Sequence, residues 1–415
     1  MQRYNMKLRD YQSDIVKKGI TVLQKHRFLY LAMEVRTGKT LTSLAMSLAL
    51  PIRNLLFITK KKAISSIQSD YDMLNPPYNI TIINYESLHK VSHETQWDMI
   101  VCDEAHSMGA FPKPSLRAKT VKEFVLKHNP FVILLSGTPT PESYSQMYHQ
   151  VYGIRTNPFR PYVNFYKFAK QYVRVTQKKI GALSINDYSN GLPTILDMMK
   201  PYTIAYSQKE AGFKVNTDEK VLNVPVSPIV KKLVRQLTKD RVVEGENNII
   251  LADTAVKLMS KLHQLYSGTV KFEGGDSMVI DLSKAEFIRK EFKNKKIAIF
   301  YKFKEELNAL KKVYRKGLCT ELEEFNSTNK SIALQIVSGR EGISLKNAQA
   351  LVYYNIDFSA TSYWQSRDRM TTKNRLYNKI YWIFSEGGIE NDIYRSVIKK
   401  KDYTLNHFKK DLLNL

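Results

Sequence analysis

A lysine and a threonine in a short turn are the first residues of this 415-residue sequence that could do chemistry. They end the stretch MEVRTGKT, residues 33–40, between an apolar run and TLTSLAMSLAL, a helical pattern that stops at Pro51. A strand, a tight turn and a helix start together present backbone N–H groups to phosphates. Lys39 would balance the charge of the β- and γ-phosphates, and the Thr40 hydroxyl would ligate Mg²⁺. Gly-Lys-Thr alone is weak evidence, but this context predicts a nucleotide site.

Two carboxylates could complete that site from another strand. The stretch WDMIVCDEAH places Asp103 and Glu104 directly after an apolar run. From the end of a buried strand, Asp103 could hold Mg²⁺, and Glu104 could orient or deprotonate the attacking water. The alternative is a polar helix cap, which would be favoured for Asp-Glu by itself. Because Gly-Lys-Thr lies upstream, the nucleotide site is the better interpretation.

Strand-like and helix-like patterns alternate in both halves of the chain. Short apolar segments such as FLYLAMEV, NLLFIT and FVILLSG are typical of buried parallel strands. The same alternation of strand-like and helix-like segments occurs again after Lys296, where the strand-like segments are KIAIFYKF, SIALQIV and ALVYYNI. The sequence therefore predicts an α/β fold with two parallel sheets in tandem and a helical, aromatic-rich extension of the first. The expected boundaries are a first lobe over residues 1–206 (core to about 150, extension over about 141–206), a linker over 207–220, and a second lobe over 221–415 (helical entry to about 290, core over about 291–415).

Positive charge greatly exceeds negative charge, with a formal net charge of +25 at pH 7. The cations are spread along the chain, so we expect a basic surface on a folded body that attracts polyanions, with a merely solvated surface as the alternative. The two cysteines, Cys102 and Cys319, exclude a disulfide framework or a cysteine zinc cluster. The sequence has no apolar signal region and no run long enough to span a membrane. We therefore expect a location in the cytoplasm of a bacterium or a phage-infected host cell.

Further motifs follow in a fixed order over roughly residues 8–385. They are LRDYQ, LLFITKKK, INYESLHK and LLSGTPTP in the first half, and KIAIFYKFKEELNAL and SGREGISLKNAQALVYYNIDFSATSYWQSRDRM in the second. With Gly-Lys-Thr and Asp-Glu-Ala-His, this series resembles that of superfamily-two helicases and translocases. It is most similar to compact, phage-type members of the Swi/Snf-related branch. The resemblance implies two RecA-like lobes, with ATP and Mg²⁺ held between them and DNA as the track.

The same resemblance assigns roles to single residues. The Gln12 amide would offer adenine a paired donor and acceptor, which selects ATP over GTP. Tyr363 and Trp364 could stack on bases, although packing within the second lobe is the commoner use of such side chains. Each proposed nucleic-acid contact, taken alone, is more often a simple surface cation. The assigned residues are the catalytic Lys39, Asp103, Glu104 and Arg369; the ATP contacts Arg9, Gln12, Arg36, Thr37, Gly38, Lys39, Thr40, Gly342 and Arg369; the coupling residues Ser136, Thr138, His106 and Gln365; the nucleic-acid contacts Lys60, Lys61, Lys62, Arg340 and Lys346; and the Mg²⁺ ligands Thr40 and Asp103.

The first motif departs from the family pattern, which reads roughly DEMGLGKT. Met33 and Arg36 stand where the family has the aspartate and the first glycine, while Glu34 and Gly-Lys-Thr persist. The residues with direct phosphate and metal roles are therefore present. Arg36 is compatible with a working loop if its φ is negative.

The arginine finger also departs from the pattern, in which arginines follow a glutamine by four and seven residues. Arg369 lies four residues after Gln365, but Thr372 occupies the second position and cannot stabilise charge on the γ-phosphate. Arg367 and Arg375 are alternatives, but the helical turn would point Arg367 away from the face of Arg369. The hypothesis is that Arg369 carries the role.

These patterns predict an ATP hydrolase that moves on duplex, forked or branched DNA, with branch migration or remodelling in replication, recombination or repair as a further expectation. One alternative is a basic nucleic-acid-binding protein with a degenerate ATPase, and another is an RNA helicase. The Lys39, Asp103 and Glu104 set argues against the first. A small-molecule kinase is disfavoured because a second α/β lobe follows with its own motifs.

Overall fold

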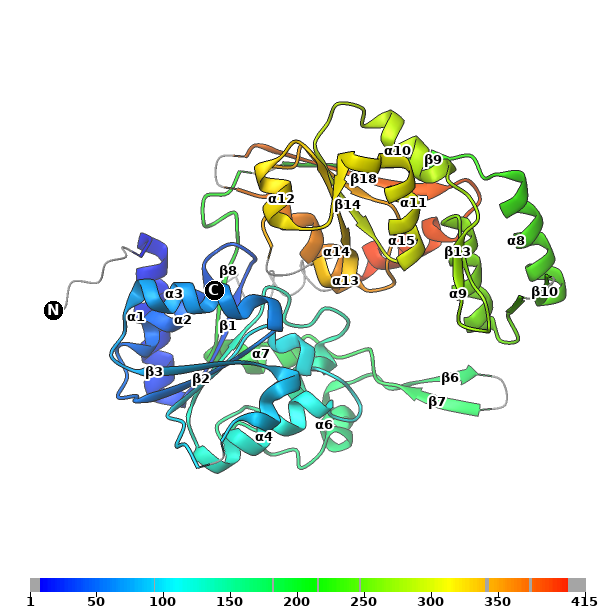
Figure 1. Ribbon diagram of the computed structural model, residues 1–415. Coiled ribbons are helices and arrows are strands. Elements are labelled where there is room, and N and C mark those ends of the chain that lie inside the picture. The colour runs from blue at the N-terminus through cyan, green and yellow to red at the C-terminus, as the bar shows by residue number, and fades with distance from the viewer. Residues whose placement is uncertain are drawn as a thin grey trace. The chain divides into compact units, whose positions relative to one another are not determined.

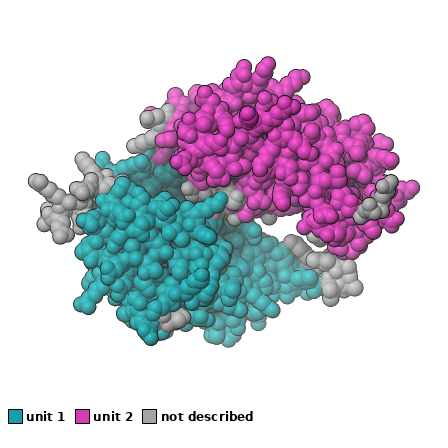
Figure 2. Space-filling model, in the orientation of Figure 1, with its two compact units in different colours: residues 1–212, 400–415 teal, residues 213–399 magenta. Residues whose placement is uncertain are grey.

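Two six-stranded parallel sheets organise the chain, which confirms the predicted fold class. The computed structural model describes residues 8–92, 94–180, 183–214, 216–245, 248–339, 343–372 and 375–401. The chain divides into unit 1, residues 1–212 with 400–415, and unit 2, residues 213–399 (Figure 2). Each unit contains one of the two sheets.

The sheet of unit 1 has the strand order β3-β2-β4-β5-β1-β8 (Figure 1). Strand β1 is buried along its whole length, as expected for a strand covered on both faces. Its last four residues pair in parallel with β8, so the region predicted as a helical extension also supplies an edge strand. The strands are β1 (Phe28–Met33), β2 (Asn54–Thr59), β3 (Asn79–Asn84), β4 (Met99–Cys102), β5 (Phe131–Leu135) and β8 (Thr203–Tyr206).

Alternate residues of these strands face two separate cores. Leu29 and Leu31 pack with the helices α1 to α3, while Phe28 and Tyr30 pack with α4 to α7. The second core is rich in aromatic rings, as the composition of the extension predicts, and an antiparallel hairpin, β6–β7, follows α6. The elements are α1 (Asp10–His26), α2 (Lys39–Ser47), α3 (Ile64–Leu74), α4 (Leu116–His128), α5 (Met147–Val151), α6 (Phe165–Tyr172), β6 (Thr176–Ile180), β7 (Leu183–Asp187) and α7 (Thr194–Met199).

The sheet of unit 2 has the order β15-β16-β14-β17-β18-β9. Strand β9 (Asn216–Val224) begins inside the range 207–220 that the sequence predicts as a linker, and it pairs with β18 over nine residues. The other strands are β14 (Ile297–Tyr301), β15 (Leu318–Cys319), β16 (Ser331–Gln335), β17 (Ala350–Tyr353) and β18 (Tyr377–Ser385).

Helices cover this second sheet on both faces, and a small satellite core precedes it. Helices α10 and α11 pack on one face, and α12 to α15 contribute to the other. The satellite core consists of α8, α9 and two short hairpins. The elements are α8 (Pro228–Asp240), β10 (Val242–Glu244), β11 (Ile249–Leu251), α9 (Ala255–Tyr266), β12 (Thr269–Lys271), β13 (Ser277–Val279), α10 (Ser283–Glu291), α11 (Lys304–Tyr314), α12 (Leu322–Ser327), α13 (Ile336–Gly339), α14 (Ala360–Arg367) and α15 (Glu390–Lys401).

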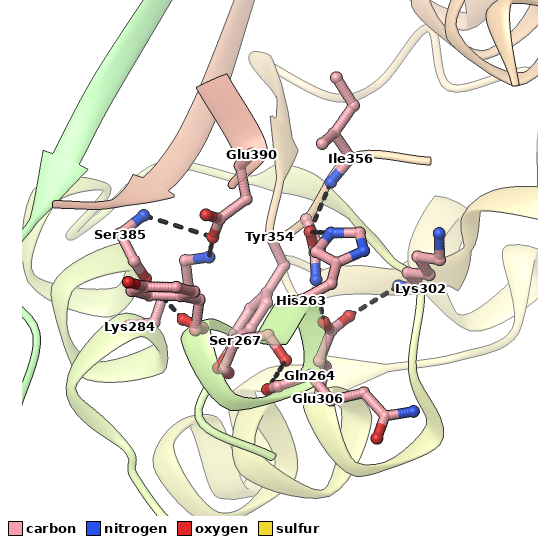
Figure 3. A network of polar contacts seen from close by, with 12 residues as sticks. His263, Gln264, Ser267, Lys284, Lys302, Glu306, Tyr354, Ile356, Ser385 and Glu390 are labelled. Carbon is pink, nitrogen blue, oxygen red and sulfur yellow. Dashed lines mark hydrogen bonds and ion pairs between the residues drawn. The ribbon is translucent and has the colours of Figure 1, made fainter. Parts of the chain in front are cut away.

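Buried polar groups connect the elements of unit 2 to one another, α10 to α15 and α9 to the segment after β17 (Figure 3). Lys284 Nζ lies 3.0 Å from Glu390 Oε1, with side chains 4% and 0% exposed. Asn355 Nδ2 donates to Glu306 Oε1 at 2.7 Å, and Asn355 Oδ1 lies 2.5 Å from His263 Nε2. Because burial disfavours its charged form, the pKa of His263 is lowered to about 3. In the described part of the chain, no helix is long and apolar enough to cross a membrane.

Candidate functional site

The loop between β1 and α2 has the phosphate-binding shape, but with an unexpected backbone angle. Arg36 has φ +66°, so the condition set from the sequence, a negative φ, is not met, and the arginine adopts a left-handed conformation that glycine would adopt at lower cost. Gly38 caps α2 at φ +81°, and a Cβ there would meet Gln12 Nε2 at 2.4 Å. Lys39 and Thr40 follow as the first residues of α2. The loop therefore requires glycine at position 38 and accepts strain at position 36.

Hydrogen bonds within the loop and from two outside residues, Gln208 and Tyr11, hold this loop in place. Thr37 Oγ1 donates to the Glu34 carbonyl at 2.7 Å. Glu34 Oε2 accepts from the backbone N–H of Gln208 at 2.7 Å, and Gln208 Nε2 donates to the Val35 carbonyl at 2.8 Å. Tyr11 OH donates to the Thr37 carbonyl at 3.0 Å. Sequence reasoning missed Gln208, because it lies in a polar stretch with no motif.

Gln12 lies against the same loop and is 4% exposed. Its Nε2 is 3.4 Å from the Gly38 carbonyl and 3.3 Å from Thr42 Oγ1, while its Oε1 accepts from Arg9 N at 3.1 Å. Arg9 Nη1 donates to Tyr11 OH at 2.9 Å. The start of α1 and the phosphate loop are thus linked through the Gln12 amide.

The two carboxylates occupy different environments after β4. Asp103 Oδ2 accepts from Thr59 Oγ1 at 2.9 Å, and the Asp103 carbonyl accepts from Tyr85 OH at 2.8 Å. Burial, then the charge of Glu104, raise the pKa of Asp103 to about 6, and the Lys39 ammonium opposes this rise. Lys39 follows β1 and Asp103 follows β4, so both come after the carboxyl ends of strands in the parallel sheet of unit 1. Thr59 and Tyr85 lie in the motif stretches LLFITKKK and INYESLHK, but no role was predicted for either side chain.

These oxygen donors fit a Mg²⁺ ion. A buried carboxylate at Asp103 and a hydroxyl at Thr40 are the ligand types that Mg²⁺ prefers. In the part of the chain that the structure describes, no cluster of three or more His, Cys, Asp or Glu side chains could hold a metal alone. The donor set is therefore suited to an ion that keeps phosphate oxygens and waters in its shell.

A chain of contacts leads from Glu104 to the segment after β5. Glu104 has φ +51° and precedes a 3₁₀ turn, Ala105–Met108. His106 Nδ1 lies 3.3 Å from Glu104 Oε2 and 3.0 Å from Ser136 Oγ, which also accepts from Thr138 N at 3.1 Å. Ser136 is fully buried. The predicted coupling residues of unit 1 are thus in one contact chain with the candidate base.

In unit 2, the candidate finger Arg369 lies in a 3₁₀ turn, Asp368–Met370, and is 7% exposed. Its Nε donates to the Gln365 carbonyl at 2.8 Å. Arg367 Nη2 forms an ion pair with Glu219 Oε2 at 2.9 Å. Arg375 donates to the carbonyls of Lys346 and Ala348 at 3.1 and 2.9 Å. Both alternatives to Arg369 therefore make contacts that hold unit 2 together.

The remaining candidates are surface cations, buried rings or residues outside the described ranges. Tyr363 is buried, stacks on Trp382 at 5.3 Å and donates to Glu219 Oε1, so it packs within unit 2. Lys60 is half-buried just after β2, and Lys61, Lys62 and Lys346 are exposed. Arg340 and Gly342 lie outside the described residues, and so does the side chain of Trp364.

The family model of the SNF2-related domain matches residues 49–267, which begin after the phosphate loop and include Asp-Glu-Ala-His. No curated protein matches. Three solved structures are similar in fold. The Sulfolobus solfataricus SWI2/SNF2 ATPase core in complex with dsDNA has 16% identity and a TM-score of 0.45, over 100% of this chain and 96% of that chain.

The second structure is the core domain of the same Sulfolobus solfataricus ATPase, with 15% identity, a TM-score of 0.42, and coverage of 98% of this chain and 92% of that chain. The third is the ATP-dependent Type ISP restriction-modification enzyme LlaBIII bound to DNA, with 12% identity and a TM-score of 0.53. That match covers 98% of this chain but 30% of the larger enzyme. At this identity, it supports the two-unit α/β fold alone.

Proposed function

Because the chain belongs to the SNF2-related family of helicases and translocases, we propose that it hydrolyses ATP to move along duplex DNA. The observation that carries the proposal is that Lys39, after β1, and the buried Asp103 with its neighbour Glu104, after β4, follow the carboxyl ends of strands in one parallel sheet. A lysine at a helix start and an acid pair on a neighbouring turn can bind a triphosphate and activate water. A nucleic-acid-binding protein without ATPase activity has no need for that combination.

Each residue of unit 1 has a distinct task in this proposal. Lys39 and the N–H groups at the start of α2 bind the β- and γ-phosphates. Thr40 and Asp103 hold Mg²⁺, which when bound neutralises phosphate charge. Glu104 orients or deprotonates the attacking water, while its contact with His106 fixes the orientation of the carboxylate.

Further residues select the nucleotide and complete the site. Gln12 and Arg9 recognise adenine. The contact between Gln12 and the Gly38 carbonyl links the adenine site to the phosphate loop. Arg369 of unit 2 stabilises charge on the transferred phosphoryl group, with Gly342 in contact with the nucleotide. An Arg369→Ala variant should lose turnover while it still binds ATP, and normal turnover would refute that assignment.

DNA is the proposed track because of the charge and the family. The net charge of +25 favours a phosphate-rich polymer, and the LlaBIII enzyme of similar fold is bound to DNA in its solved structure. Lys60, Lys61, Lys62, Arg340 and Lys346 contact backbone phosphates, so binding is independent of sequence and weakens with salt. Forked and branched junctions are the proposed physiological substrates.

A panel of nucleic acids tests this function. ATP hydrolysis is measured with single-stranded DNA, duplex DNA, forks, four-way junctions and RNA, and displacement of a triplex-forming strand reports movement along an intact duplex. The wild type should respond to duplex or branched DNA and displace the third strand only with ATP. Lys39→Ala should do neither, and stimulation by RNA alone would refute the proposal.

A further inference from the structure

Unit 2 has a pocket of about 770 Å³ whose lining includes Lys296 and Gln349, each from one of the motif stretches, and otherwise lies outside those stretches or at their margins. It is lined by the end of α10, the turn before β14, the end of α11, and residues that precede or begin β15, β16 and β17, such as Gly317, Ser331 and Gln349. Since these strands are parallel, the pocket lies at their amino edge. The carboxyl ends of β14, β16 and β17 lie at the other edge of the sheet, roughly 15 Å away along a five-residue strand.

The pocket has a clear excess of positive charge. Its lining contains five cations and one carboxylate, Glu286. Helices α10 and α11 also end here, and each helix C-terminus adds roughly −0.5 charge. The cations could serve only to neutralise these two helix ends. However, the five cations, the one carboxylate and the two helix ends together leave a net charge of about +3. The cations are Arg289, Lys290, Lys293, Lys295 and Lys296.

These cations differ in what they already contact. Lys296 Nζ donates to the Thr328 carbonyl at 2.5 Å, so this ammonium has a partner within the unit. The Arg289 guanidinium lies over the Tyr314 ring at 5.2 Å, and its Nη1 is 3.5 Å from the Tyr314 carbonyl, which fixes its orientation. Lys290 and Lys293 are exposed and make no ion pair or side-chain hydrogen bond with any residue in the described ranges.

The rest of the lining indicates the class of ligand. Small-molecule pockets are mostly apolar with few polar groups. The lining of this pocket contains three amide side chains, Asn294, Asn329 and Gln349, besides the cations, and its ring Phe292 is buried. An oriented guanidinium with two unpaired ammonium groups matches a phosphodiester backbone, which needs charge contacts without base recognition.

We propose that this pocket, at the amino edge of the sheet, binds backbone phosphates of DNA. The inference rests on the proposed function and extends it. The contact keeps the DNA attached to unit 2 without taking part in ATP chemistry. It should therefore affect DNA affinity and its salt dependence, and leave hydrolysis without DNA unchanged.

The test compares two double variants in the full chain. Lys290→Gln with Lys293→Gln removes the unpaired pocket cations, and Lys231→Gln with Lys232→Gln removes two exposed lysines of α8 as the matched control. Duplex binding is measured by fluorescence anisotropy from 0.05 to about 0.5 M salt. Each phosphate contact contributes about 0.9 to the slope of log K against log salt, so the pocket variant should have a slope lower by about 2. That corresponds to roughly 60-fold weaker binding at 0.1 M salt, well beyond any loss in the control.

Failure of the inference differs from failure of the proposed function. If the wild type hydrolyses ATP in response to duplex DNA but the pocket and control variants bind DNA equally well, the inference is wrong and the function stands. If the wild type neither binds duplex DNA nor responds to it, both are wrong. A further arm measures protection of Lys290 from acylation, and protection by tripolyphosphate but not by duplex DNA would overturn the inference.

Discussion

Replacing Ser136 with alanine should destabilise unit 1 by about 2 kcal/mol. The hydroxyl is fully buried, accepts from Thr138 N at 3.1 Å and lies 3.0 Å from His106 Nδ1. A buried polar group that loses its partner costs about 1–3 kcal/mol. His106 keeps its contact with Glu104 at 3.3 Å, so the main loss is at the Thr138 amide.

Thr138→Val is the matched control for this variant. Thr138 Oγ1 is buried and has no hydrogen-bond partner in the described part of the chain. Valine keeps the shape of the side chain and removes a hydroxyl that makes no hydrogen bond within the described part of the nucleotide-free protein. Its stability should therefore stay within about 1 kcal/mol of the wild type.

Calorimetric unfolding and ATP hydrolysis together test the pair. For a unit of about 200 residues, 2 kcal/mol lowers the melting midpoint by about 4–8 °C. We expect that decrease for Ser136→Ala and almost none for Thr138→Val. Because the Thr138 hydroxyl is proposed to act in coupling, Thr138→Val should lower the DNA-stimulated rate and spare the basal rate. Equal midpoints for Ser136→Ala and the wild type would refute the reasoning, as would a Thr138→Val variant with full DNA stimulation.

Three further outcomes follow from buried charge and backbone strain. Burial lowers the pKa of His149 to about 4, so between that pH and about 6.5 the unfolded chain binds a proton that the folded chain does not bind. The contribution of His149 to the free energy of unfolding should therefore fall by about 2 kcal/mol from pH 7.5 to 5, and His149→Asn should remove about that amount from the pH dependence measured in urea titrations. Lys284→Met should cost about 3–5 kcal/mol because it leaves Glu390 buried without a cation, and adding Glu390→Leu should restore most of the urea midpoint. Arg36→Gly should raise the melting midpoint of the nucleotide-free protein by relieving about 0.5–1 kcal/mol of net strain, and a lower midpoint would contradict this.

Patterns dominated by burial were predictable from the sequence. Strand β1 is covered on both faces, so its residues are all apolar, and the turn after it is recognisable by Gly-Lys-Thr. The same holds for β4 and the acid pair that follows it. In these strands, the requirement for burial determines nearly every residue, so the apolar pattern is clear in the sequence.

Other features could not be predicted because no single requirement fixes their sequence. Strand β9 is an edge strand with mostly exposed or half-buried residues, so NTDEKVLNV looks like a polar linker although it pairs with β18 throughout. Gln208 supports the phosphate loop through its backbone N–H and amide, which many residues or loops could replace. The left-handed conformation of Arg36 comes from the loop closure and not from any preference of arginine.

The proposed role of Glu104 is to activate water for hydrolysis of an ATP molecule held by Lys39. Its most direct test is the ATP turnover rate of the wild type and of Glu104→Gln at saturating duplex DNA, with ATP affinity measured for both. A general base contributes about 10²–10⁴-fold, so the variant should bind ATP as tightly as the wild type and turn over at least about 100-fold more slowly. Equal turnover by the two proteins would show that Glu104 is not the group that activates water.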